Sequence, residues 1–447
     1  MTTPVPLVAA RARVPGEYAW RFLRDPLDAL TRFAALGDLV TFGRGAERLL
    51  LVNHPEHVRE VLVTNQRNFK KGRALERARL LLGDGLLTAE GDEHRRHRRM
   101  LQPGFHRQHV LRYGEAMVDA ATRHAGRWTD GQRMDMHREM SALALVIAGT
   151  TLFGADVAGE ASDVATALEH TFGAFMRTFY LPGGERLLRL PLPSSRKFWR
   201  ATALLESTVY RLIAERRASG DQRDDLLSLL LAARDDEGDG TGLTDRQVRD
   251  EAMTFFLAGH ETTANALTWT WLLLARHPEV ADRLAEESTA LGAALPTADD
   301  LPRLPYARMV LSESMRIFPP AWMVARRALG PFALGGHEFP AETLVLTSPY
   351  LVHRDARWWP DPLRFDPERW AGEPPADRPR FAWFPFGGGA RMCIGEHFAW
   401  LEGILVLATI AREWRFTLEP DAQVRPQATI TLRPRGGIAM RARRRHA

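Results

Sequence analysis

The sequence predicts an α+β fold, mostly α-helical, in which one large helical domain carries a smaller β-rich portion. From about Glu93 to Ser288, apolar residues recur at three- and four-residue spacing, which is the period of an amphipathic helix. Short apolar runs of strand length occur before Asn68 and again between Arg326 and Thr347. The 447 residues contain no Ser/Gly-rich or Pro-rich linker and no internal repeat. We therefore expect a single domain over residues 1–447.

The first strands are predicted at Leu39–Phe42 and Leu49–Val52, two apolar runs in a hairpin-like arrangement. A long helix is predicted over roughly Asp245–Arg276, where the apolar face repeats with helical period. Thr244 and Gln247 stand at its start with the spacing of a capping box, in which each side chain bonds the backbone N–H of the other residue.

Towards the C-terminus, a helix over Tyr306–Ile317 is predicted to end at Pro319-Pro320, because proline cannot continue a helix. Strand character follows from Arg326 to Thr347. A further helix is expected to end near Trp414, and Ala428–Leu432 is predicted as a strand.

Charge is nearly balanced, with 60 basic and 55 acidic residues and a formal net charge of +5. Two runs are dense in basic residues, His94–Arg99 and Arg441–Arg445. Neither is interleaved with aromatic residues or set in a DNA-binding motif, so we expect no nucleic-acid partner. We expect the second run to be a solvated tail. Because the N-terminal region has neither a run of about 20 apolar residues nor the core of a signal peptide, we expect a cytoplasmic protein without a membrane anchor.

The single cysteine, Cys393, lies in the glycine-rich stretch Phe386–Gly395. A lone cysteine cannot form an internal disulfide or a multi-cysteine metal site, but it can give one thiolate to one metal. The surrounding glycines leave room for a large flat group against the backbone. Arg391 can pair with an anion on that group. An iron porphyrin with carboxylate arms meets all three demands, whereas the alternative is an inert buried cysteine in a glycine-rich turn.

A second motif, Ala258–Thr263, lies inside the long predicted helix. A glycine followed by an acid and two threonines is poor helix-interior chemistry, because threonine hydroxyls bond back to preceding carbonyls and open the helix locally. Such an opening would leave space for oxygen and water beside a metal, where Glu261 could relay protons and Thr262 could assist. The alternative is an ordinary buried helix with a satisfied polar patch.

A third motif places Glu313 and Arg316 three residues apart, on one face of the helix predicted over Tyr306–Ile317, where they can pair. The fourth motif, Phe365–Trp370, comes shortly before the cysteine stretch and contributes Arg369. We hypothesise that this arginine joins the pair in a buried network that locks the cysteine loop.

These four motifs, in this order, resemble the cytochrome P450 superfamily, and the resemblance extends from about Asp25 to the last strand. Its most specific part is Phe386–Gly395, which is similar to the cysteine-loop signature of the family. The resemblance implies a haem b cofactor with Cys393 as proximal iron ligand, Thr262 and Glu261 as the oxygen-activation and proton-delivery pair, and Glu313, Arg316 and Arg369 as a structural triad. It further implies that the haem is held by Arg391, His94, Arg98, Arg326, Phe386, Gly387 and Gly395. His94 stands where close relatives more often have tryptophan.

By this resemblance the protein is expected to be a haem-thiolate monooxygenase that inserts one atom of O2 into a C–H bond. No flavin domain or dinucleotide fingerprint is found, so a separate ferredoxin and its reductase are the expected electron donors to a monomer. Arg95, Arg96 and Arg99 are expected to help form a basic face for an acidic donor. A peroxygenase or isomerase is disfavoured, because relatives of those kinds usually lack the acid–threonine pair, and a haem sensor without catalysis is disfavoured by the intact relay motif.

The expected substrate is hydrophobic, because the predicted pocket walls are apolar. These walls are Leu80–Leu82, Phe172, Phe175, Phe255, Phe256, Trp322, Met323 and Val324. Segments that include Pro319–Trp322 and Ile430–Pro434 are similar to a bacterial branch that includes carotenoid β-ring hydroxylases. We therefore expect a carotenoid or similar long isoprenoid, with a fatty acid or another terpenoid as the alternative.

Overall fold

The computed structural model describes residues 5–10, 17–43, 48–154, 167, 188, 190–220, 223, 225–235, 237–238 and 240–445. Its helices are α1 (Glu17–Arg24), α2 (Pro26–Ala34), α3 (Pro55–Arg59), α4 (Arg73–Leu82), α5 (Gly91–Leu101), α6 (Arg107–Leu111), α7 (Gly114–Ala125), α8 (Met136–Phe153), α11 (Pro193–Ser219), α12 (Leu226–Ala232), α13 (Asp245–Arg276), α14 (Pro278–Thr289), α15 (Pro305–Ile317), α16 (Pro349–Val352) and α17 (Glu396–Glu413). Its strands are β1 (Leu7–Ala9), β2 (Leu39–Phe42), β3 (Leu49–Val52), β4 (Phe69–Lys71), β5 (Arg133–Asp135), β6 (Val324–Ala328), β7 (Phe332–Leu334), β8 (His337–Phe339), β9 (Leu344–Thr347), β10 (Trp414–Leu418), β11 (Pro426–Ala428), β12 (Leu432–Pro434) and β13 (Ala439–Arg444).

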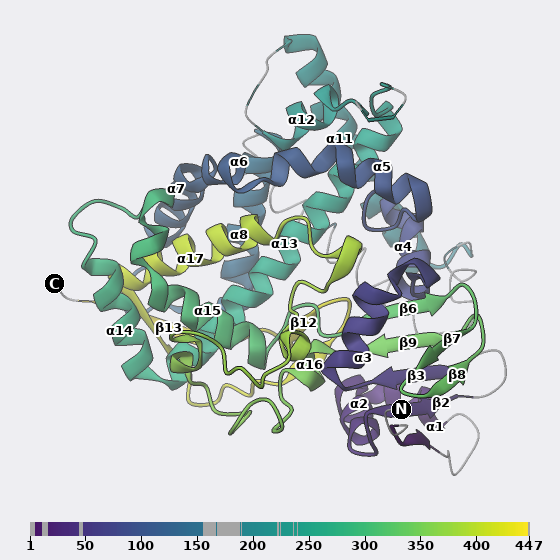
Figure 1. Ribbon diagram of the computed structural model, residues 1–447. Coiled ribbons are helices and arrows are strands. Elements are labelled where there is room, and N and C mark those ends of the chain that lie inside the picture. Colours follow the sequence, from purple (N-terminus) through teal and green to yellow (C-terminus); the bar gives the residue numbers. More distant parts are fainter. Residues whose placement is uncertain are drawn as a thin grey trace.

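Helix α13 runs through the middle of the helical part and packs against α8, α11, α15 and α17 (Figure 1). Its residues Leu267 and Trp269 are fully buried. The helix has the predicted bounds, and the capping box of Thr244 and Gln247 is present at its start. The fold class is therefore the predicted one, helix-dominated with smaller sheets.

A six-stranded sheet with the order β1-β2-β3-β9-β6-β4 lies at one end of the molecule beside α1, α2 and α3 (Figure 1). The predicted strands Leu39–Phe42 and Leu49–Val52 are its antiparallel neighbours β2 and β3. At the inner edge, β4 pairs with β6 and sets Lys71 opposite Arg326. This register brings two cations from distant parts of the chain together.

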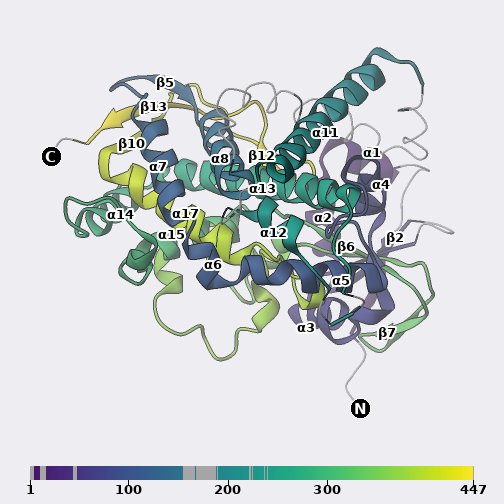
Figure 2. The same cartoon turned by 90° about the horizontal axis from the view of Figure 1, so that it is seen from above.

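The C-terminal region differs from its prediction in two places. Ala428–Leu432 is the turn of an antiparallel hairpin between β11 and β12 rather than a strand. The basic run Arg441–Arg445 is not a solvated tail, because β13 forms the middle strand of the β10-β13-β5 sheet. Arg445 pairs with Asp282 of α14 at 2.6 Å. Both views place this sheet at the opposite end from the six-stranded sheet (Figures 1 and 2).

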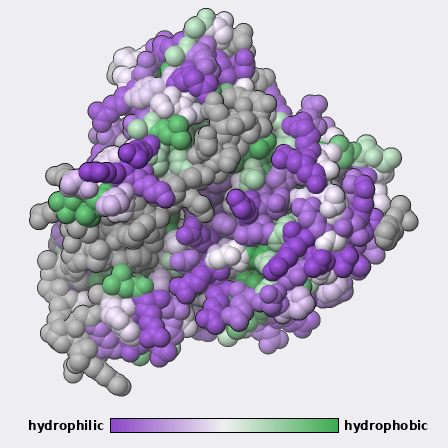
Figure 3. Space-filling model, turned by 180° about the vertical axis from the view of Figure 1, so that it is seen from behind, coloured by the Kyte–Doolittle hydropathy of each residue, from purple (hydrophilic) through white to green (hydrophobic). Residues whose placement is uncertain are grey.

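The face opposite to that of Figure 1 is mostly hydrophilic, with small scattered apolar areas (Figure 3). In the part of the chain that the structure describes, none of the helices has the length and apolar character that crossing a membrane requires.

Candidate active site

The loop that carries Cys393 precedes α17 and folds back on itself. The Cys393 N–H donates to the carbonyl of Phe386 at 2.9 Å, which closes the loop. Gly387 has a φ of +74°, a left-handed conformation that favours glycine. Gly389 has a φ of +70°, and a Cβ there would lie 2.0 Å from the carbonyl oxygen of Leu62. Gly387 is therefore favoured by its backbone conformation, and Gly389 is required because the loop packs tightly against the backbone of Leu62.

The Cys393 thiol lies deep in the protein but has an accessible side. Burial raises the pKa of Cys393 to about 11, while a hydrogen bond from the Gly395 backbone and the charge of Arg98 act in the opposite direction. The side chain is nevertheless exposed in the structure. The space beside the thiol at Gly395 is open: a Cβ atom added to Gly395 would lie 4.0 Å from Cys393 Sγ and 4.0 Å from the ring of Phe105. The thiol can therefore be reached by a ligand rather than being the inert core cysteine of the alternative reading.

The middle of α13 also has an accessible side. Residues before and after it are buried, but Ala258 is exposed and Gly259, Glu261 and Thr262 are half-buried. Thr262 Oγ1 donates to the Ala258 carbonyl at 2.6 Å, which is the predicted back-bond. The helix remains continuous through this segment, so the expected local opening is absent. What the motif supplies is a strip of small and polar residues that is at least partly accessible.

The cysteine loop and α13 are close to each other. The ring of Phe105, which approaches Gly395, lies 4.9 Å from the ring of Phe255 on α13. Thr263 of α13 donates a hydrogen bond to Glu402 of α17, the helix that begins just after the thiol. The accessible thiol and the accessible strip of α13 thus belong to neighbouring elements.

A group of basic side chains converges beside the cysteine loop. Burial is the main cause that lowers the pKa of Lys71 to about 7, with the charges of Arg391 and Arg326 adding to it. Burial also lowers the pKa of His94 to about 4, helped by the charges of Lys71, Arg391 and Arg98. Because each of these groups disfavours the charged form of its neighbours, they must lie close together.

One carboxylate pairs with this group. Glu90 forms an ion pair with Arg391 and accepts a hydrogen bond from the Lys71 backbone at 2.6 Å. Burial acts to raise the pKa of Glu90, but these partners hold it below its ordinary value. Burial lowers the pKa of Arg326 to about 10, and Arg391 contributes. The basic side chains outnumber the carboxylate that pairs with them, and the group therefore favours a further anion.

These observations test whether a haem fits. Nη1 of Arg391 is buried and has no hydrogen-bond partner among the described residues. A Cβ at Gly387 would meet nothing within 4 Å. The two carboxylates of a haem would supply acceptors to the guanidinium groups of Arg98, Arg326 and Arg391. An accessible thiol, an open glycine backbone and an orphaned guanidinium nitrogen together fit a haem.

Behind the loop, the predicted network of Glu313, Arg316 and Arg369 is present. Glu313 accepts from Nε and Nη2 of Arg316, each at 2.8 Å, and from Nε of Arg369 at 3.3 Å. It also accepts from the indole of Trp370 at 2.9 Å and from the Asp366 backbone at 3.1 Å. Arg316 donates in addition to three backbone carbonyls of residues 353, 362 and 364. With every charge satisfied, this buried network holds α15 to the segment that leads into the loop.

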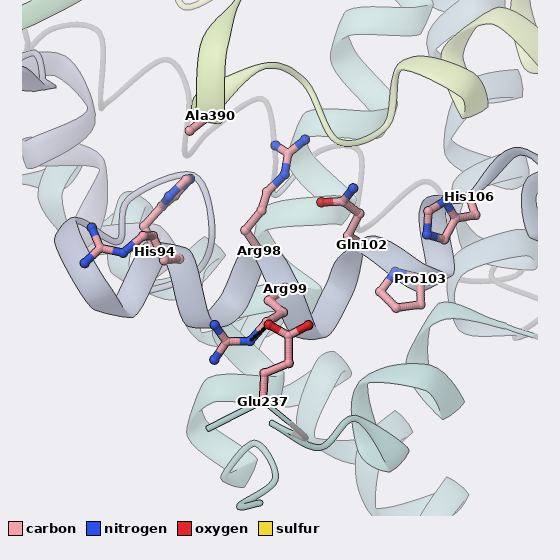
Figure 4. Close-up of a pocket in the computed structure, with 9 residues that line it drawn as sticks. His94, Arg98, Arg99, Gln102, Pro103, His106, Glu237 and Ala390 are labelled. Atoms are coloured by element: carbon pink, nitrogen blue, oxygen red, sulfur yellow. Dashed lines mark ion pairs between the residues drawn. The ribbon is translucent and has the colours of Figure 1, made fainter. Parts of the chain in front are cut away.

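Two arginines of α5, Arg98 and Arg99, turn in opposite directions. Figure 4 shows Arg98 turned towards the segment that carries Ala390, and Arg99 turned towards Glu237. These residues line a pocket of about 380 Å³. Arg96 and Arg99 are not free as the expected basic face would have them, because both form ion pairs with the buried Asp235.

Several important residues were not identified from the sequence. No local motif marks these residues, because each gains its partner from a distant element; they are Lys71, Glu90, Glu402 and Thr431.

Among the expected pocket walls, Phe256 packs against Phe153 in the core. Leu81, Leu82, Phe255 and Trp322 are buried, Leu80 is exposed, and Met323 and Val324 are half-buried. Phe172 and Phe175 lie outside the described residues.

The fold and the site together define a helix-dominated protein that holds a haem by one cysteine thiolate. A family model described as Cytochrome P450 matches residues 24–440. Cyclooctatin synthase of Streptomyces melanosporofaciens is 40% identical over 418 residues, which cover 93% of this chain and 91% of that protein. Pentalenene oxygenase of Streptomyces avermitilis is 40% identical over 418 residues, covering 93% and 92%. Cyclooctat-9-en-7-ol 5-monooxygenase of Streptomyces melanosporofaciens is 41% identical over 400 residues, covering 89% and 86%.

This chain belongs to the cytochrome P450 family. The prediction of a haem-thiolate monooxygenase is therefore confirmed.

Proposed function

We propose that this monooxygenase hydroxylates a terpenoid. The observation that carries the proposal is the set of relatives at 40% to 41% identity over most of their length, whose names specify pentalenene and cyclooctat-9-en-7-ol as substrates. These names favour the terpenoid alternative over the carotenoid that the sequence segments suggested. The carotenoid expectation stays a prediction that no comparison tests.

The geometry of the site supports the following roles for its residues. When bound, the haem supplies an iron centre that activates O2 for insertion into a C–H bond. Cys393 holds the iron, and Arg98, Arg326, Arg391 and His94 hold the carboxylate arms. Phe386 and the glycines of the loop keep the thiol in reach.

Proton delivery is assigned to the accessible strip of α13. The hydroxyl of Thr262 can exchange its bond to the Ala258 carbonyl for a bond to a group in the accessible space. Burial raises the pKa of Glu261 above its ordinary value, which favours the protonated form that a proton donor needs. The pair therefore supports the proton-relay role that the resemblance implies.

The electron donor is proposed to be a ferredoxin with its reductase, acting on a cytoplasmic, monomeric protein. The main hydrophobic core includes residues from Leu27 to Ala442, which supports a single functional domain.

Arg95 is the most exposed arginine of the α5 run, with 68% of its side chain accessible. It is the strongest candidate in that run for contact with an acidic donor.

An optical titration of the ferric protein tests the substrate class. Terpenoid hydrocarbons, carotenoids and long-chain fatty acids are each added, and displacement of the iron-bound water is followed as a shift of the Soret band. The proposal expects a saturable shift with terpenoids at concentrations where the other two classes give none. A saturable shift with carotenoids or fatty acids alone would contradict it.

A further inference from the structure

We infer that Thr431 is a positioning residue for the reaction, whose hydroxyl holds the carboxyl of Glu261. This inference rests on the proposed relay role of Glu261 and extends it to the β11–β12 hairpin. Thr431 Oγ1 donates to Glu261 Oε1 at 2.7 Å, across 170 residues of sequence. Thr431 is buried in the turn of the hairpin.

A second residue of α13 fixes the direction of this hydrogen bond. Asn265 Nδ2 donates to Thr431 Oγ1 at 3.1 Å. Glu261 and Asn265 are four residues apart, so both lie on the face of α13 that meets the hairpin. A hydroxyl has a single proton, and with Asn265 as donor to its oxygen that proton is directed at Glu261.

The turn that carries Thr431 is itself held in place. The backbone N–H and the hydroxyl of Thr429 both donate to the Thr431 carbonyl, at 2.9 and 2.8 Å. The indole of Trp322 donates to the Thr429 carbonyl at 2.9 Å, and that of Trp269 donates to the Leu432 carbonyl at 2.8 Å. Four hydrogen bonds therefore fix the turn that presents the Thr431 hydroxyl to Glu261.

The consequence for Glu261 has a definite sign. Burial raises the pKa of Glu261, whereas the bond from Thr431 and the charge of Arg433 on β12 both act to lower it. Thr431 thus stabilises the carboxylate and occupies Oε1, which leaves Oε2 for proton exchange. Without the hydroxyl, the carboxyl would be more firmly protonated and less well oriented.

The test compares four variants of the haem-loaded protein. Thr431→Val removes the hydroxyl with little change of shape, and Thr431→Ser keeps it. Thr417→Val makes the same substitution at an exposed threonine of β10 and is the matched control. Glu261→Gln identifies the carboxyl band in infrared difference spectra and shows what loss of the relay does.

Two readouts are taken, the infrared titration of the Glu261 carboxyl in the ferric protein and the share of electrons released as hydrogen peroxide during turnover. Thr431→Val is expected to raise the pKa of Glu261 further and to increase peroxide release several-fold, and Thr431→Ser is expected to restore both. A titration that Thr431→Val leaves unchanged, or that Thr417→Val shifts equally, would overturn the inference. Unchanged peroxide release in Glu261→Gln would instead contradict the proposed relay, and the infrared titration would still decide whether Thr431 holds the carboxyl.

Discussion

Replacing Glu402 by glutamine should remove one contribution to the loss of stability of this protein at alkaline pH. Glu402 projects from α17 into the core with only 1% of its surface accessible. Burial raises its pKa from 4.5 to about 8, and the hydrogen bond from Thr263 opposes this only in part. Its Oε1 is buried without a hydrogen-bond partner among the described residues. The folded protein therefore keeps this carboxyl neutral at pH 7.

The magnitude follows from the two pKa values. Between pH 4.5 and pH 8 the folded state holds a proton that the unfolded state has lost, so the contribution of Glu402 to stability is present at low pH and disappears as the pH rises. Over the full interval this loss is about 5 kcal/mol. Glutamine resembles the neutral acid and does not titrate. The stability of Glu402→Gln relative to the natural chain should therefore grow by about 4 kcal/mol between pH 5 and pH 9.

The assay is urea-induced unfolding of the haem-loaded proteins, followed by tryptophan fluorescence at a series of pH values and a fixed excess of haem. Glu413→Gln is the matched control, because Glu413 ends the same helix with 56% of its side chain exposed. The control should follow the natural chain at every pH. Parallel pH profiles for Glu402→Gln and the natural chain would refute the assignment of a neutral buried acid.

Three further predictions concern the network behind the loop, the cation group and the donor face. Glu313→Gln should lower the free energy of unfolding by roughly 3–5 kcal/mol, because it leaves a buried arginine without its charge partner; urea unfolding that differs by less than about 1 kcal/mol would contradict this. Arg391→Met should raise the dissociation constant of haem about tenfold, the worth of one hydrogen bond to a charge, because Nη1 of Arg391 is buried without a partner among the described residues; haem transfer to excess apomyoglobin measures this constant. Arg95→Glu should slow reduction by a ferredoxin at low salt and lose its effect at high salt, whereas Arg32→Glu, at a comparably exposed ion pair on α2, should not; equal effects of the two substitutions would contradict a donor face on α5.

The elements with strong local signals were predictable from the sequence. The bounds of α13 follow from a capping box and a continuous apolar period, and those of β2 and β3 from short apolar runs. The pairing of Glu313 and Arg316 needed only their spacing on one helix. In each case the information lies within a few consecutive residues.

Features that depend on distant partners were not predictable. Lys71 joins the cation group only because β4 pairs with β6 in one particular register. Arg445 ends a basic run that the sequence predicted to be solvated, but its acidic partner Asp282 lies on α14. The sequence predicted Arg96 and Arg99 as surface charges, but in the structure both form ion pairs with Asp235. A charged residue carries no sign of its partner when that partner lies on another element.

The central claim is that Cys393 holds the haem iron as a thiolate. The most direct measurement is the absorption spectrum of the reduced carbon monoxide complex of the purified protein, beside that of Cys393→Ser. We expect the red-shifted Soret band of a thiolate-ligated haem in the natural chain and its loss in the variant. If the natural chain shows the band of a neutral ligand, or if the variant keeps the thiolate band, Cys393 is not the thiolate ligand.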